Sequence, residues 1–334
     1  MAKTTLQDVA DRAGVALSTA SNALNGSDLV TESTREKVLA AAKALDYIPN
    51  INGKLLRGGK SKRLAFVTSS VRGEYFERLL DRINYFCNEN KYQLDIIISR
   101  DSKILMSRML EGIYDGFFVF EGEFLLPEDL ERLIKSQIKI VFLDREYSNK
   151  NISSVLFDSE QASYELTNYL INLGHRNIAY VDFSAENYDS RERRSGYLRA
   201  LEDNNIDFKD EYILYGEFDE KISYQALLDF YKEDRESFNE VSAYLCGNDQ
   251  SAIGVSNALK ELNFKLPEEK SVAGFDDISL SKYFNPSITT VHNPIEKQGE
   301  IAAKLLIGLV NEDFKGQIVK LEGKLIKRES TANV

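Results

Sequence analysis

The sequence contains few of the residues that brace small secreted proteins or hold metals. It has no tryptophan, five prolines, two histidines and two cysteines in 334 residues. Since Cys87 and Cys246 are the entire cysteine content, they provide neither a disulfide framework nor a cysteine-rich zinc site, and a reduced compartment is the simpler expectation. We therefore expect no metal site and no cofactor.

Long apolar runs are also absent. The first residues lack the apolar stretch of 7 to 15 residues that marks a signal peptide, and no run approaches the roughly 18 apolar residues of a membrane span. Hydrophobic residues make up 43% and charged residues 28%, which is typical of globular proteins. A chain of 334 residues is too long for one hydrophobic core. We expect a cytoplasmic protein of two or three domains that does not bind membranes.

Catalytic motifs are missing too. The sequence has no Walker loop, no zinc-ligand spacing and no Gly-x-Ser-x-Gly nucleophile elbow. Asp276 and Asp277 are adjacent carboxylates, which is a weak basis for assigning acid and base roles. We expect that the protein is not an enzyme.

The negative charge is unevenly distributed along the chain. The net charge is −11, yet residues 50–63 carry five basic side chains and no acidic one. The first 63 residues hold 10 basic and 6 acidic side chains, whereas the remainder holds 32 and 47. Three glycines in the basic stretch indicate a linker. The average acidity argues against nucleic-acid binding, but the basic front of the chain permits it.

Residues 5–46 have the pattern of three short helices. Thr5 and Asp8 form a capping-box pattern, and Gly14 ends the first apolar periodicity. A second helix is expected from Leu17 to Asn25, and a third from about Thr31 to a point before Pro49. Two short helices joined at residues 13–15, with a third packed behind them, are typical of a helix-turn-helix domain.

Residues 4–50 resemble the headpiece of the lactose-repressor/galactose-repressor (LacI-type) family of bacterial transcriptional regulators. The resemblance runs from Thr4-Thr5-Leu6-Gln7-Asp8-Val9-Ala10 through Thr34-Arg35-Glu36-Lys37-Val38 to Tyr47-Ile48-Pro49-Asn50. It implies a DNA-binding headpiece over residues 1–49 and a hinge helix and linker over residues 50–62.

The remaining residues alternate short apolar runs with longer amphipathic ones. Helices are expected, for example, over 76–90, 160–173, 194–204 and 250–262. Such alternation predicts parallel sheets covered by helices on both faces, and about 270 residues are enough for two lobes. The expected strands are 64–68, 94–99, 116–120, 138–143, 154–157, 177–183, 243–246 and 271–275.

Polar residues follow several of these strands, where ligands of open parallel sheets bind. They include Asp144, Asp158, Asn248 and Asp276, whereas Asp249 has the position of a helix cap. This part resembles the effector domain of the same family, which is similar to periplasmic sugar-binding proteins. The resemblance rests on residues 142–145, 173–179, 193–197, 247–249, 274–277 and 288–291.

The complete fold implied is a small all-α helix-turn-helix headpiece followed by a two-lobed, periplasmic-binding-protein-like α/β body with parallel sheets over residues 63–334. The resemblance places the N-lobe at about 63–157 and 289–317. It places the C-lobe at about 158–288 and 318–331.

The resemblance also implies which headpiece residues contact DNA. The second helix enters the major groove, so Leu17, Ser18 and Asn22 are the candidate base readers; Asn can bind adenine through two hydrogen bonds. The family commonly has Arg at position 22 and Ser at position 16, so Asn22 and Ala16 imply a different operator half-site. Candidates for backbone contacts, for which helix capping is the alternative role, are Thr5, Thr19, Ser21, Asn25, Thr34 and Tyr47.

The hinge residues that match the family include Asn50, Lys54, Leu56 and Arg57. In the family this segment folds on operator DNA, and a leucine inserted at a base step opens the minor groove. Leu56 is the candidate, while Gly53 replaces a usual Ala and weakens the helix by up to about 1 kcal/mol.

For the effector, the family's cleft implies polar contacts from Asp144, Arg193, Asn248 and Asp276, because charged planar groups bind sugar hydroxyls well. Capping of the next helix is the alternative role of these strand-end side chains. Tyr75, Phe76 and Tyr188 are candidates for stacking on a sugar.

The resulting hypothesis is a repressor of carbohydrate-utilisation genes that binds palindromic double-stranded operator DNA as a homodimer and is released by a small sugar. One alternative is activation by a corepressor, either a purine or a phosphocarrier protein. Another is a stand-alone sugar-binding or sugar-metabolising α/β protein.

Overall fold

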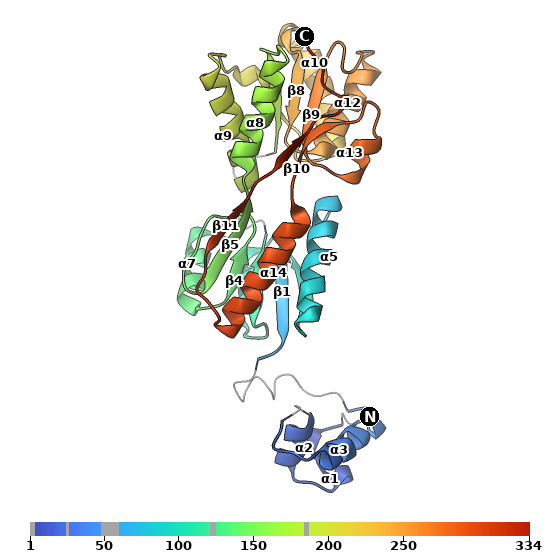
Figure 1. Cartoon of the computed structure of the whole chain (residues 1–334), viewed down its shortest axis with the longest axis vertical. Helices are drawn as coiled ribbons and strands as arrows, with labels where there is room; N and C mark the ends of the chain where they lie inside the picture. Colours follow the sequence, from blue (N-terminus) through green and yellow to red (C-terminus); the bar gives the residue numbers. More distant parts are fainter. Residues whose placement is uncertain (1–3, 25–26, 48–59, 121–124, 184–186) are drawn as a thin grey trace. The chain divides into compact units, whose positions relative to one another are not determined.

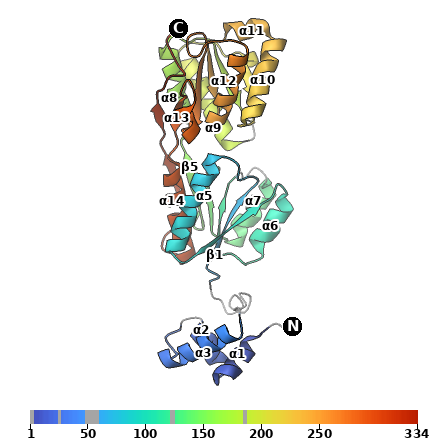
Figure 2. The ribbon, with the colours of Figure 1, turned by 90° about the vertical axis from the view of Figure 1, so that its right-hand side faces the viewer.

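The computed structural model describes residues 4–24, 27–47, 60–120, 125–183 and 187–334. The chain divides into two compact units, residues 1–61 and 62–334 (Figures 1 and 2). The boundary lies within one residue of the expected start of the body. In the described residues, no helix combines the length and apolarity needed to cross a membrane.

The first unit contains the three expected helices, α1 (Leu6–Ala13), α2 (Leu17–Leu24) and α3 (Glu32–Ala44). Helix α1 begins with the predicted capping box, in which the Asp8 Oδ2 accepts a hydrogen bond from the Thr5 N at 2.8 Å. Gly14 ends it in the left-handed conformation, with φ of 68°. Val9, Ala20 and Val38, one from each helix, meet in a small core. The expected helix-turn-helix domain is thus confirmed.

The described part of the body contains two sheets of six strands each. In the first sheet every neighbouring pair is parallel, and the spatial order is β11-β5-β4-β3-β1-β2. Its strands are β1 (Arg63–Thr68), β2 (Gln93–Ile98), β3 (Gly116–Val119), β4 (Ile140–Phe142), β5 (Ile152–Phe157) and β11 (Ile318–Leu321).

The second sheet has the order β12-β10-β9-β8-β6-β7 and is parallel except for β12, which pairs antiparallel with β10. Its strands are β6 (Ile178–Asp182), β7 (Ile213–Tyr215), β8 (Ala243–Cys246), β9 (Ser271–Asp276), β10 (Thr289–His292) and β12 (Lys324–Ile326). The two sheets confirm the expected α/β body.

Helices cover both faces of each sheet because alternate strand residues point to opposite sides. On β1, Leu64 and Phe66 pack against one group of helices, while Ala65 and Val67 pack against the other. In the N-lobe, one face carries α5 (Glu74–Glu89) and α14 (Ile295–Asn311), and the other carries α6 (Ser102–Leu110) and α7 (Pro127–Ser136).

The C-lobe is layered in the same way. Tyr180 packs toward α8 (Ser159–Asn172) and α9 (Tyr188–Asp203), whereas Val181 packs toward the opposite group. That group consists of α10 (Glu220–Glu233), α11 (Arg235–Glu240) and α12 (Asp249–Glu261). The short elements are the 3-10 helix η2 (Asp210–Tyr212) before β7 and helix α13 (Ser279–Tyr283) after β9.

The chain crosses between the lobes three times: from β5 to α8, from β10 to α14 and from β11 to β12. We expected residues 289–317 in the N-lobe and 318–331 in the C-lobe, and two strands differ. Strand β10 pairs with β9 in the second sheet, and β11 pairs with β5 in the first. Both assignments were wrong, because the chain crosses to the other lobe after β10 and after β11, and not before them.

The crossing segments pack closely at Gly323. A Cβ atom added to Gly323 would lie 2.7 Å from the Val291 Cγ1 and 2.9 Å from the Phe157 ring. Since Phe157 ends β5 and Val291 belongs to β10, residues of all three crossings meet at this point. Glycine is needed here for close approach.

Helix α9 begins six residues earlier than expected, at Tyr188 instead of Arg194. Asn187 caps it, because its Oδ1 accepts a hydrogen bond from the Ser190 N at 3.0 Å. This cap places Arg193 within the helix.

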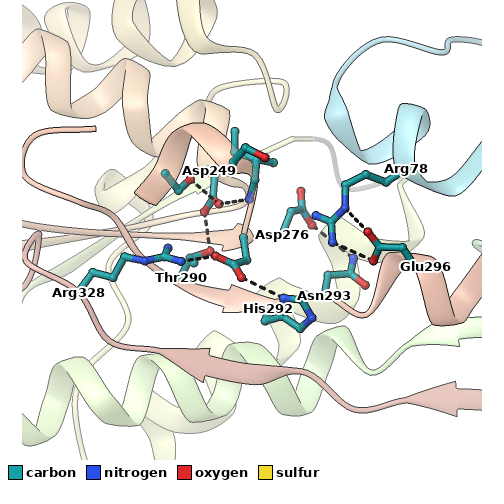
Figure 3. A network of polar contacts seen from close by, with 12 residues as sticks. Arg78, Asp249, Asp276, Thr290, His292, Asn293, Glu296 and Arg328 are labelled. Atoms are coloured by element: carbon teal, nitrogen blue, oxygen red, sulfur yellow. Dashed lines mark hydrogen bonds and ion pairs between the residues drawn. The ribbon is translucent and has the colours of Figure 1, made fainter. Parts of the chain in front are cut away.

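Asp249 connects three elements of the C-lobe from a fully buried position (Figure 3). Its carboxyl group accepts hydrogen bonds from the Thr290 Oγ1 at 2.6 Å, the Ser281 Oγ at 2.6 Å and the Ile278 N at 3.0 Å. Our expectation that Asp249 caps a helix was wrong: Asn248 caps α12 by accepting from the Ser251 N at 2.8 Å. Burial raises the pKa of Asp249 to about 8.

This carboxyl group makes stability depend on pH in a predictable direction. With a folded-state pKa of about 8 against an ordinary value of 3.8, folded Asp249 keeps a proton that the unfolded chain releases. Its contribution to the free energy of unfolding is therefore lost as pH rises from about 4 to about 8. Asp249→Asn keeps a neutral group of similar shape and should lose less stability between pH 5.5 and pH 8.5 than the unsubstituted protein.

Urea unfolding of the full chain at the two pH values checks this, with Asp207→Asn, an exposed substitution, as the control. Parallel loss of stability in Asp249→Asn and the unsubstituted protein would contradict the assignment.

Candidate functional site

Helix α2 presents the candidate base readers at the surface of the headpiece. The Leu17 side chain is 42% exposed. Ser18 is exposed and Asn22 is half-buried. An accessible face with one amide, one hydroxyl and one apolar side chain has the chemical variety that major-groove reading requires.

The candidates for backbone contacts differ in accessibility. Thr5 is exposed, while Thr19, Thr34 and Tyr47 are half-buried. The hydroxyl of Thr5 belongs to the capping box, and the Thr34 Oγ1 lies 3.0 Å from the Thr31 Oγ1. Ser21 is only 5% exposed, so its side chain is poorly placed for a phosphate. Asn25 and the four hinge residues Asn50, Lys54, Leu56 and Arg57 lie outside the described residues.

A cavity of about 700 Å³ lies at the carboxyl ends of strands from both sheets of the body. Its lining comes from the segments that follow β1, β2 and β3 in the N-lobe, and from those that follow β6, β7, β8 and β9 in the C-lobe. This volume suits a small organic molecule.

The C-lobe wall of the cavity is organised around Arg193, which is 5% exposed. Its guanidinium donates a hydrogen bond to the Gly247 carbonyl, and its Nη2 lies 3.7 Å from the Asp276 Oδ1. The group also lies over the rings of Phe275, at 4.8 Å, and Phe218, at 5.4 Å. A charge buried this deeply needs such partners, and they hold it in one orientation.

Asp276 is the acidic counterpart of Arg193. It has a φ of 97°, so the backbone leaves β9 in a left-handed turn that directs the carboxylate to the cavity. Burial raises the pKa of Asp276, and the neighbouring Arg193 acts in the opposite direction. The Asn293 Nδ2 donates to the Asp276 Oδ1 at 3.4 Å. Figure 3 shows Asp276 and Asn293 between the Asp249 cluster and the ion pair of Arg78 with Glu296.

Aromatic rings supply the apolar part of the cavity. In the N-lobe, Tyr75, Phe76 and Phe120 form a cluster with ring centroids 5.0 to 5.5 Å apart. In the C-lobe, Phe183 stacks on Phe218 at 4.9 Å. Aromatic faces beside an Arg–Asp pair are typical of sites that bind flat-faced polar molecules, such as sugars and nucleobases.

Hydrogen bonds also connect the two lobes beside the cavity. Glu74, on the N-lobe helix α5, accepts hydrogen bonds from the Ser279 N at 2.9 and 3.0 Å and from the Ser279 Oγ at 3.0 Å. Arg78 lies 3.8 Å from Glu74 and donates to both oxygens of Glu296, at 2.7 and 3.0 Å. A ligand in the cavity would therefore lie next to groups that connect the lobes.

Five of the seven effector residues proposed from the sequence line this cavity: Tyr75, Phe76, Arg193, Asn248 and Asp276. Of these, Asn248 already caps α12, and its Nδ2 donates to the Phe218 carbonyl at 3.0 Å. Asp144, which is buried, and Tyr188, which is half-buried, are not among the described residues that line it.

Sequence reasoning missed most of the lining. The missed residues lie between a strand and the following helix or in the first turn of that helix, so a search of these longer segments after every strand would have found many of them. They are Ser69, Ser70, Arg72, Gly73, Glu74, Arg100, Phe120, Phe183, Asn187, Asp189, Glu217, Phe218, Asp219, Ile222, Gln250 and Ile278.

The described residues contain no group of three or more His, Cys, Asp or Glu side chains able to hold a metal ion. His175 is buried away from the cavity, with its ring nitrogens 2.9 Å from the Ser242 Oγ and 3.1 Å from the Ala332 carbonyl.

Known proteins resemble both units of the chain. Residues 5–50 match the family described as bacterial regulatory proteins, lacI family, and residues 167–331 match the periplasmic binding protein-like domain. The probable HTH-type transcriptional repressor ExuR of Bacillus subtilis (strain 168) is 32% identical over 316 residues, 92% of each chain. The HTH-type transcriptional repressor PurR of Proteus mirabilis (strain HI4320) is 29% identical, covering 98% of this chain and 97% of its own.

Solved structures also resemble the fold of this chain. The lac repressor dimer bound to operator and the anti-inducer ONPF has a TM-score of 0.82 at 24% identity, covering 99% of this chain and 100% of its own, and supports the fold. The CelR–cellobiose complex has a TM-score of 0.73 at 25% identity, covering 98% and 100%. With a matching headpiece, a matching body and a relative at 32% identity over nearly its whole length, the chain belongs to the lacI family of bacterial regulatory proteins.

Proposed function

We propose that the protein is a repressor of carbohydrate-utilisation genes that binds a palindromic operator as a homodimer and responds to a small sugar-type effector. The observation that carries the proposal is the combination, in one chain, of a helix-turn-helix unit with an accessible second helix and a two-lobed body with a polar, aromatic cavity. Relatives that span almost the whole chain are named repressors.

The domain roles follow from this proposal. Residues 1–49 bind DNA, residues 50–62 act as hinge and linker, and residues 63–334 bind the effector and form the dimer. Leu17, Ser18 and Asn22 read bases, and Thr5, Thr19, Thr34 and Tyr47 contact the backbone. For the hinge we keep Asn50, Lys54, Leu56 and Arg57 as minor-groove contacts.

The body recognises its effector through the Arg193–Asp276 pair and the surrounding aromatic rings. Paired hydrogen bonds to hydroxyls and stacking on a ring face are the interactions that sugars require. In support, the CelR structure was solved with cellobiose and that of an Enterococcus faecium regulator with bound ribose. Because the relatives are named repressors, we propose no enzymatic role. We also propose a cytoplasmic location, which DNA binding supports.

Activation by a corepressor, either a purine or a phosphocarrier protein, is the alternative mode. The two modes predict opposite effects of the ligand on operator affinity. A stand-alone sugar-binding protein would have no use for the helix-turn-helix unit.

Asn22→Ala tests the DNA interface. Since a bidentate contact to a base contributes about 1–3 kcal/mol, the substitution should weaken binding to a palindromic site selected by the full chain from random DNA by roughly 5- to 150-fold. Binding to non-specific DNA should change little. Fluorescence anisotropy measures both, and Asn172→Ala on the exposed surface of the body is the matched control. Equal losses on both DNAs would exclude base reading by Asn22.

Asp276→Asn tests the effector site. A thermal-shift screen of the full chain against sugars, sugar phosphates and purines first identifies a stabilising ligand. The substitution should then lower the affinity for that ligand at least about 10-fold, because a charge-assisted hydrogen bond is lost. The affinity for the operator without ligand should stay within a factor of about 3. Asp207→Asn should change neither. Unaltered ligand affinity in a folded Asp276→Asn protein would remove Asp276 from the site.

The ligand's effect on the selected operator then decides the mode. Weaker DNA binding supports induction, and tighter binding supports the corepressor alternative.

A further inference from the structure

Two arginines of the N-lobe, Arg72 and Arg100, line the cavity. Arg72 follows β1 and Arg100 follows β2, and these strands are parallel neighbours in which Thr68 pairs with Ile98. The register continues one step beyond the strands, since the Ser99 N donates to the Thr68 carbonyl at 3.0 Å. The segments that carry both arginines therefore leave the sheet side by side.

Local hydrogen bonds shape the segment that carries Arg72. The Thr68 Oγ1 donates to the Ser70 carbonyl at 2.8 Å, and the Ser70 Oγ accepts from the Arg72 N at 3.2 Å. The segment ends at Gly73, which has a φ of 92° and is the N-cap residue of α5. The position of Arg72 is thus set by the backbone, while its side chain is exposed to the cavity.

The carboxylates that line the cavity are mostly engaged elsewhere. Glu74 accepts from Ser279, and the Asp189 Oδ1 accepts from the Ser159 Oγ at 2.7 Å. Asp219 caps α10 by accepting from two backbone N–H groups, and Asp276 pairs with Arg193. Among the described residues, Glu217 is the lining carboxylate whose side chain has no such bond.

The arginines that line the cavity, in contrast, have donor groups without a partner among the described residues. Arg72 and Arg100 have no side-chain hydrogen bond or ion pair with any residue that the structure describes. Arg193 is paired, but its buried Nε has no hydrogen-bond partner in the described chain. In addition, α5 starts at the cavity with no side-chain cap, so its first N–H groups favour negative charge there. Among the described lining residues, these unpaired hydrogen-bond donors therefore outnumber the one unpaired carboxylate, that of Glu217.

From this imbalance we propose that the effector is an anionic sugar derivative, whose carboxylate or phosphate is bound by Arg72 and Arg100 and whose hydroxyl-bearing ring lies against Arg193 and Asp276. The inference rests on the proposed effector role of this cavity and specifies its ligand class. Arginine is suited to the task because its planar group binds either anion through two parallel hydrogen bonds.

The test uses sugars that differ only at carbon 6. Glucose, glucuronate and glucose 6-phosphate form one set, and galactose, galacturonate and galactose 6-phosphate form a second. Calorimetric titration of the full chain in a phosphate-free buffer measures each affinity. The proteins are the unsubstituted chain, Arg72→Gln, Arg100→Gln and, as a matched control, Arg176→Gln, which changes an exposed arginine at the opposite end of the C-lobe strands.

We expect an acid or a phosphate of at least one set to bind on the order of 10-fold or more tightly than its neutral parent. Arg72→Gln and Arg100→Gln should each lower the affinity for that anion by on the order of 10-fold and the affinity for the neutral sugar by less than about 2-fold. Arg176→Gln should bind like the unsubstituted chain. Preference for the uronates or for the phosphates identifies the anionic group.

Neutral sugars binding as tightly as their anions, or no binding by any anion of the two sets, would overturn the proposal. Thermal midpoints without ligand address the other use of these arginines, pairing with Glu217 when the lobes close. If Arg72→Gln or Arg100→Gln lowers the ligand-free midpoint and leaves anion affinity unchanged, the arginines hold the lobes and the proposal fails. Operator binding by the same preparations shows which proposal has failed. If the protein binds operator, the proposed repressor function stands whatever the ligand class; if it does not bind operator, the repressor function itself is excluded.

Discussion

The connectivity between the lobes constrains the rest of the body. Because the chain crosses at β5–α8, β10–α14 and β11–β12, neither lobe is a continuous segment, and each sheet contains strands from distant parts of the sequence. The crossings pack around Gly323, where a side chain has no room against Val291 and Phe157. Relative motion of the lobes must therefore pass through a few residues at the crossings. The segments after the strands of both sheets line one cavity, so a ligand there contacts both lobes at once.

Charge in the cavity is carried by a fixed pair, Arg193 with Asp276, and by arginine donors that have no partner among the described residues. Arg193 and Asp276 are buried, and each is oriented by several contacts, so they can bind a ligand without reorganising. Glu74 lines the same cavity and bonds to Ser279 of the other lobe, next to the Arg78–Glu296 pair. A ligand that changes the surroundings of Glu74 would change a contact between the lobes. Its effect on operator affinity is limited by how differently it binds the two arrangements of the body.

Much of this architecture can be predicted from sequence, where local signals are sufficient. The capping box at Thr5 and the left-handed Gly14 define the first helix, and apolar runs such as 243–246 define buried strands. Strand partnership is not local: Ile318–Leu321 is compatible with either sheet, and only pairing with β5 decides. Asn248 takes the capping role expected of Asp249, because its extended backbone starts α12 one residue earlier, and Asp249 is instead buried among Ile278, Ser281 and Thr290. Arg72 lies four residues beyond β1, and its place in the cavity depends on the turn held by Thr68 and Ser70.

Coupling between the cavity and DNA binding is the central claim, and reciprocal linkage tests it most directly. Calorimetric titration of the full chain with its stabilising ligand, in the presence and absence of saturating operator DNA, measures whether one site senses the other. The account predicts that operator changes ligand affinity by the same factor by which the ligand changes operator affinity, on the order of 5- to 150-fold. Identical ligand affinity with and without operator would contradict it.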